Sequence, residues 1–86
     1  MPEICRFFGI IIAVFYEDHP PPHFHVRYSD QQAIIAIETL RILEGRLSSR
    51  VLGLVVEWAL LHRPELARAW EQARQRVPID PIPPLE

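Results

Sequence analysis

The sequence predicts an α+β fold, in which a small antiparallel sheet of three to four strands is followed by two helices packed on one face. The first half of the chain carries short runs of β-branched and aromatic residues between turn residues, whereas apolar residues recur with helical spacing from Ser48 onward. Strands followed by helices are typical of this class. A length of 86 residues allows one domain and excludes multidomain enzymes. We assign residues 1–77 to a single domain and residues 78–86 to an extended, proline-rich tail.

Four runs are candidate strands. Residues 7–15 are apolar and rich in β-branched and aromatic side chains, which predicts one buried strand. Three prolines at 20–22 then stiffen the chain before residues 23–28 alternate as a second strand. Residues 32–38 form the third, and residues 41–44 a short fourth that Gly45 ends. We expect a two-residue turn at Thr39 and Leu40 between the last two strands.

Two helices follow. Ser48 or Ser49 can cap the first, whose residues 51–61 are apolar almost all round, so that we expect this helix to be nearly buried. Pro64 separates the helices, because proline disfavours helix for the preceding residue and suits the first turn of a new one. One apolar face of the second helix is formed by Leu66, Trp70, Ala73 and Val77.

Charge and cysteine content narrow the possible functions. The formal charge is −2, with nine arginines and no lysine, and arginines dominate residues 41–76 whereas acidic residues dominate 1–40. This bipolar pattern argues against a protein wholly committed to nucleic acid and favours a charged protein partner or a local RNA contact. The single Cys5 excludes an internal disulfide, and the apolar run at 7–15 is too short to span a bilayer. We therefore expect a cytoplasmic protein that does not associate with membranes.

One face of the predicted sheet lacks a cover. The first and third predicted strands are apolar on both sides, but the two helices account for only one face. Since large exposed apolar surfaces mark interfaces, a partner chain or a homodimer is the simplest cover for the other face.

The densest group of chemically active residues is the segment 17–25, Glu-Asp-His-Pro-Pro-Pro-His-Phe-His. His23 and His25 project to the same face of a strand, and the prolines limit the conformations of the loop that carries His19. These histidines and carboxylates could supply a general acid and base, contact RNA, bind a transition metal, or be purely structural. We nominate His19, His23 and His25 as catalytic candidates, and assign neither a metal nor a cofactor.

The helices carry a second group of candidates. Trp58 and His62 lie four residues apart on the first helix, with Glu57 beside them, and a carboxylate near a strand histidine would make a site. The alternative is that Trp58 is a core residue and His62 helps to end the helix. Arg68 and Arg74 on the second helix could reach phosphates of DNA or RNA, although the turn between the helices is shorter than in helix-turn-helix proteins. We nominate Arg27, Glu57, His62, Arg68 and Arg74 as binding residues.

Several of these motifs together resemble a small bacterial family, domain of unknown function 4160. They are Met-Pro-Glu-Ile with Phe8-Gly9, Tyr-Glu-Asp-His leading into Pro-Pro-His-Phe-His-Val, Leu43-Glu44-Gly45, Glu57-Trp58, His62, Glu65-Leu66 and Trp70. The resemblance implies a type II toxin–antitoxin-like module in which this family is the toxin candidate and a protein of domain of unknown function 2442 is its partner. The motif contains His19, His23 and His25, so the resemblance implies that these three histidines are functional residues of the family. Leu40 departs from the family, where similar sequences have glycine, and favours a longer loop.

Two functional hypotheses follow. In the first, the protein is a toxin-like component neutralised by a cognate antitoxin-like protein, and His23, His25 and Arg27 act on or block RNA. In the second, it is a non-catalytic regulator or adaptor that binds a protein or nucleic acid through its sheet edge and its arginine-bearing helix. The sequence does not decide whether the protein is an enzyme.

Overall fold

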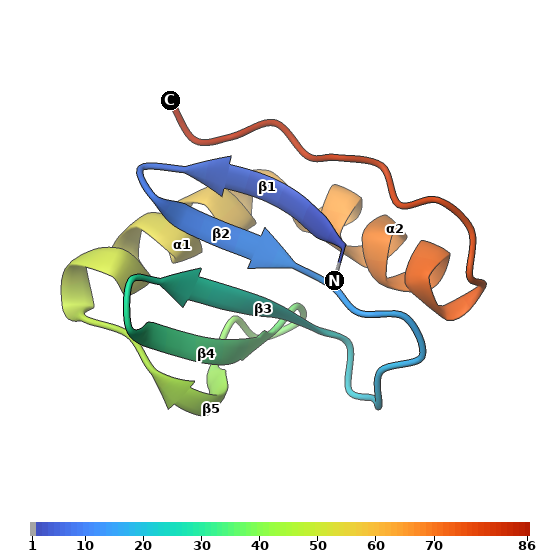
Figure 1. Cartoon of the computed structure of the whole chain (residues 1–86), viewed down its shortest axis with the longest axis horizontal. Coiled ribbons are helices and arrows are strands. Elements are labelled where there is room, and N and C mark those ends of the chain that lie inside the picture. The colour runs from blue at the N-terminus through green and yellow to red at the C-terminus, as the bar shows by residue number, and fades with distance from the viewer. Residues whose placement is uncertain (1) are drawn as a thin grey trace.

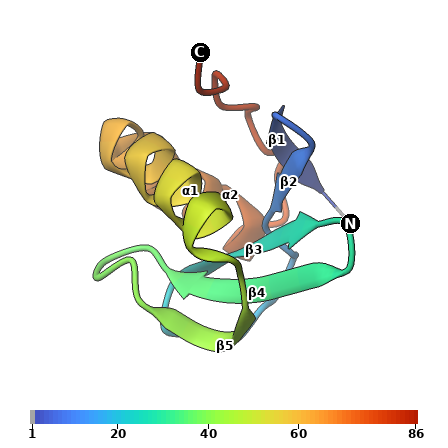
Figure 2. The same cartoon turned by 90° about the vertical axis from the view of Figure 1, so that its left-hand side faces the viewer.

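A computed structural model describes residues 2–86, and it confirms the α+β class with five strands instead of three to four. The strands are β1 (Glu3–Phe7), β2 (Ile10–Ala13), β3 (His23–Tyr28), β4 (Gln31–Ala36) and β5 (Ile42–Arg46). Each pairs antiparallel with the next along the chain, in the order β1-β2-β3-β4-β5. The helices α1 (Ser49–Leu61) and α2 (Arg63–Arg74) follow, and both cover the same face of the sheet (Figures 1 and 2).

The extra strand comes from the apolar run at 7–15, where the prediction of a single strand was wrong. Phe8 and Gly9 form a tight turn with φ values of 50° and 80°, so that Phe7 pairs with Ile10 across a hairpin. Positive φ at both central residues is the conformation of a type I′ turn. Such turns usually contain Asn, Asp or Gly at the first central position. A phenylalanine there concealed the turn within the apolar run.

The connection between β4 and β5 is also longer than predicted. Residues 37–41 separate the two strands, and the loop is closed by hydrogen bonds from Leu40 N to Ala36 O (2.8 Å) and from Ala36 N to Arg41 O (3.0 Å). Leu40 has a φ of 61°, a left-handed conformation that glycine adopts without a steric penalty. The two-residue turn was therefore wrong, and the longer loop favoured by Leu40 is correct.

The core lies between the sheet and the helices. Alternate strand residues such as Ile12, Phe24 and Ile35 are fully buried there, together with Trp58 from α1 and Leu66 from α2. The expectation that α1 is nearly buried was wrong. Leu60 and Leu61 are 58% and 64% exposed because the helix lies at the surface of a two-layer molecule and presents only one face to the sheet.

The predicted start of α1 and the predicted break between the helices are confirmed by local contacts. The Ser48 side chain accepts a hydrogen bond from Val51 N and caps α1, and Pro64 lies in the first turn of α2. On α2, the residues Leu66, Trp70 and Ala73 are buried as predicted. The prediction that Val77 belongs to this face was wrong, because Val77 lies beyond the end of the helix and is 38% exposed. No helix within residues 2–86 is long and apolar enough to cross a membrane.

The tail, residues 78–86, contains neither helix nor strand and runs beside β1 (Figure 1). Ile82 is 5% exposed, and its backbone N–H donates a hydrogen bond to Ile4 O (2.9 Å). Trp58 Nε1 donates to Pro83 O (2.9 Å). The tail is thus joined both to the edge of the sheet and to the core.

Cys5 offers a simple test of this packing. It is 6% exposed, and burial raises the pKa of its thiol. Because only the thiolate reacts with disulfide reagents, we expect Ellman's reagent at pH 8 to modify native protein at least about 100-fold more slowly than unfolded protein. Cys5 is the only cysteine in the chain, so labelling in guanidinium chloride provides the reference rate and the expected stoichiometry. Equal rates in the two states would contradict the burial of β1.

Candidate functional site

Strand β3 places His25 and Arg27 on the face of the sheet that the helices leave bare. Phe24 and Val26 point into the core, so the residues between and after them point the opposite way. His25 pairs with Ala13 of β2 and Ile34 of β4. We call this face the outer face. Its residues on the central strands and β5 include Ile11, Ala13, His25, Arg27, Gln32, Ile34, Glu44 and Arg46.

A carboxylate and two imidazoles meet at the start of β3. Asp18 Oδ2 lies 2.8 Å from His23 Nε2 and 2.9 Å from His25 Nε2. One ligand atom from each residue lies within 4.8 Å of the others. These three residues are referred to below as the Asp–His cluster. The strand holds the two histidines, and the proline loop returns the chain so that Asp18 faces them.

Aromatic side chains fix both rings. The His23 ring lies 5.0 Å from the ring of Trp70 on α2, and the His25 ring lies 4.0 Å from that of Phe15. His23 is 7% exposed, and its Nδ1 lies 2.7 Å from Pro21 O, which accepts a hydrogen bond from it. Both polar contacts of the His23 ring are therefore made by residues of the loop, and the ring has little freedom to rotate.

Asp18 is held in its ionised form. Partial burial acts to raise the pKa of its carboxyl, but hydrogen bonds from His25, from the backbone N–H of His19 and from His23 together outweigh burial and lower that pKa below its usual value. The cluster therefore presents a carboxylate at neutral pH.

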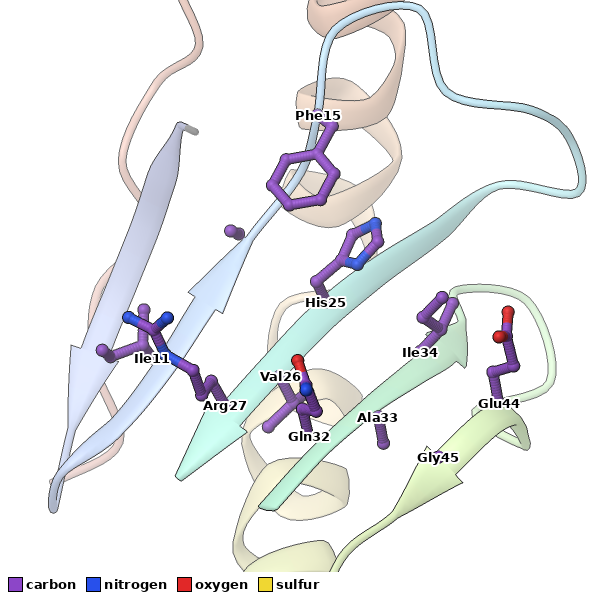
Figure 3. Close-up of a pocket in the computed structure, with 11 residues that line it drawn as sticks. Ile11, Phe15, His25, Val26, Arg27, Gln32, Ala33, Ile34, Glu44 and Gly45 are labelled. Carbon is purple, nitrogen blue, oxygen red and sulfur yellow. The ribbon is translucent and has the colours of Figure 1, made fainter. Parts of the chain in front are cut away.

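His25 also lines a cavity on the outer face, with a volume of about 390 Å³. Figure 3 shows its side chains, with Phe15 above His25, Arg27 on the same strand, and Ile34 and Glu44 on the strands beyond. The cavity is open and mixed in character: aliphatic and aromatic surface surrounds one imidazole, one guanidinium and one carboxylate. Such a mixture suits a polar ligand or a partner side chain.

The structure brings together two of the three predicted catalytic candidates. His23 and His25 share Asp18, whereas the side chain of His19 is exposed and only its backbone N–H contacts Asp18. Sequence reasoning noted the Asp18 carboxylate but chose His19 as the third member. The position of Asp18 before three prolines could have indicated its role. A loop that reverses direction between two paired strands brings its first residues close to the start of the second strand.

The candidates on the helices lie apart from this cluster. His62 Nδ1 lies 2.7 Å from Glu65 Oε2, and the His62 ring lies 5.7 Å from that of Trp58. This histidine therefore links the C-terminal end of α1 to the first turn of α2. Glu57, Arg68 and Arg74 are exposed, and Arg74 lies 3.6 Å from Glu71. No contact in the described part of the chain joins Glu57 to a strand histidine.

Together, the meander sheet, the two helices on one face and the Asp–His cluster define a small α+β protein with a polar site at the start of its third strand. A family model described as "Domain of unknown function (DUF4160)" matches residues 9–71. The match covers more than half of the chain and includes the whole cluster, so the protein belongs to this family. The resemblance noted from the motifs is confirmed. Neither a curated protein nor a solved structure shows significant similarity to the chain.

Proposed function

We propose that the protein is the toxin-like component of a two-protein module, that its outer face is the surface that acts on RNA, and that a cognate antitoxin-like protein neutralises it by covering this face. The single observation that carries the proposal is the position of His25. Its ring is hydrogen-bonded to Asp18 and packs against Phe15, and His25 lines the same open cavity as Arg27.

Arg27 supplies the charge that an RNA contact needs. It is exposed on the outer face between Ile11 of β2 and Gln32 of β4. A guanidinium has five donors in a planar fork and binds phosphate with two hydrogen bonds. With His25 two residues away on the same side of the strand, a phosphodiester in the cavity would meet both a fixed cation and an imidazole.

The apolar residues of the same face support a protein partner. Ile11, Phe15 and Ile34 are only partly buried and surround the polar groups in the cavity. An interface with an apolar centre and a few charged groups is typical of specific protein complexes. A partner that covers these residues would also exclude RNA from His25 and Arg27, so binding and neutralisation would be the same event.

The test is expression of the chain alone and together with the gene beside it. We expect expression alone to arrest growth, co-expression to restore it, and His25→Ala and Arg27→Ala each to abolish the arrest without loss of the folded protein. Arg50→Ala removes the same charge from an exposed position on α1 and serves as the matched control, which should remain as inhibitory as the original chain. Normal growth despite abundant folded protein would refute the proposal.

The second candidate function is a regulator or adaptor that binds nucleic acid through α2. One further variant distinguishes it from the toxin-like function of the outer face. Arg68 and Arg74 are both exposed on this helix. If the double variant Arg68→Ala/Arg74→Ala loses salt-dependent binding to DNA or RNA while His25→Ala retains it, the helix is the binding surface and the outer face is not.

A further inference from the structure

We propose that Asp18, His23 and His25 form a binding site for a divalent transition-metal ion. This goes beyond the proposed function and depends only on the arrangement of the three ligand atoms. The ligands would be one carboxylate oxygen and two imidazole nitrogens, a set that suits zinc, cobalt, nickel or iron(II) better than magnesium or calcium.

The two distances from the Asp18 carboxylate to the imidazole nitrogens are those expected when the three residues share one metal ion. Imidazole nitrogens and carboxylate oxygens bind transition metals at about 2.0–2.1 Å, so two ligands at right angles lie about 2.9 Å apart. Asp18 Oδ2 lies 2.8 Å from His23 Nε2 and 2.9 Å from His25 Nε2. All three ligand atoms lie within 4.8 Å of one another, so small side-chain rotations would bring both imidazole nitrogens within the roughly 4.2 Å that ligands of one ion can span.

The hydrogen bond from His23 to the loop strengthens this assignment. Pro21 O can only accept, so His23 Nδ1 carries the ring proton in that contact. Nε2 is then the ring atom that faces Asp18 Oδ2, at 2.8 Å. Metal-bound histidines characteristically donate their other N–H to a backbone carbonyl or a carboxylate, which is the pattern of His23.

The surroundings hold the ligands while leaving one side accessible. Trp70 and Phe15 pack against the two imidazoles, and three prolines separate Asp18 from His23. The side chains of His23, Asp18 and His25 are 8%, 20% and 24% exposed. An ion at this point would therefore have one buried ligand and two at the surface, next to the cavity that Arg27 lines.

The experiment uses full-length, untagged protein stripped of metal with a chelator. Titration with Co²⁺, followed by its visible absorption, and with Zn²⁺, followed by calorimetry, should show saturable binding of one ion per chain. Zinc should also raise the unfolding temperature, because an ion that binds only the folded state stabilises it. The variants Asp18→Asn and His25→Gln should each weaken binding at least about tenfold. His62→Gln, which removes the histidine outside the segment 17–25, should bind as tightly as the original chain.

Each possible outcome either supports the metal site or overturns it. Circular dichroism of the metal-free variants establishes whether they are folded, and the Co²⁺ spectrum of the unaltered chain reports the coordination geometry of the bound ion even if a variant fails to fold. Absence of saturable binding by the unaltered protein would overturn the proposal, as would binding that Asp18→Asn and His25→Gln leave unchanged. Metal binding is measured without any growth assay. Absence of metal binding would therefore leave the proposed function standing, and normal growth on expression would leave the metal site standing.

Discussion

Replacing Trp58 by alanine is expected to cost about 3–5 kcal/mol of the free energy of unfolding, the range observed when a buried aromatic side chain is truncated. Trp58 is 0% exposed, and its ring lies 5.6 Å from that of Phe7 and 6.1 Å from that of Phe24. It thus joins α1 to β1 and β3. Since small domains are stable by only about 5–15 kcal/mol, the loss would remove a large share of the total.

The measurement is urea unfolding followed by circular dichroism. Trp58→Phe separates the contribution of the hydrogen bond from that of apolar packing. It keeps most of the apolar contacts but loses the hydrogen bond to Pro83 O, so we expect it to lower the free energy of unfolding by about 1 kcal/mol. Leu61→Ala is the matched control on the same helix. Leu61 is 64% exposed, so its truncation should change stability by no more than about 0.5 kcal/mol. Similar losses for Leu61→Ala and Trp58→Ala would contradict the position of the core.

Gly45→Ala is expected to lower the free energy of unfolding by at least about 2 kcal/mol. Gly45 has a φ of 85°, and a methyl group there would collide with the Gln32 carbonyl oxygen and lie 2.8 Å from Ala33 Cα on the neighbouring strand. The obstruction is backbone, which cannot rotate away, so β5 would have to separate from β4.

Gly53→Ala provides the opposite result within the same chain. Gly53 lies inside α1, and a methyl group there would meet nothing within 4 Å. Alanine in a helix interior is favoured over glycine by about 0.5–1 kcal/mol, so this variant should be more stable. Thermal unfolding of both variants beside the original chain checks the pair. Equal effects of the two substitutions would show that φ and space at Gly45 do not constrain the sheet.

The sequence was most informative where a pattern had a single physical meaning. Residues 23–28 were predicted as a strand and form β3 with the same bounds, because alternation over six residues fits a pleated strand and little else. Ser48 was one of two predicted caps and is the one used. The helix break at Pro64 followed from the missing N–H and fixed φ of proline.

It was least informative where backbone conformation opposed residue preference. Phe8, Leu40 and Ser29 all have positive φ, a region that nonglycine residues seldom occupy, and two of these turns were misplaced or missed. Pairing across the sheet decides these conformations, and such long-range contacts are not encoded in local composition. The inclusion of Asp18 in the cluster has the same origin, since it depends on how the proline loop closes over paired strands.

The tail lies along β1, which is one of the two edges of the sheet. A sheet normally ends in two rows of unsatisfied backbone groups, each able to recruit a foreign strand. Here Ile82 N–H donates to Ile4 O and the tail covers part of the β1 edge, whereas the residues of β5 are all exposed. We therefore expect a foreign strand to pair more readily with β5 than with β1. Loss of the last nine residues would restore the second edge and with it a route to polymerisation.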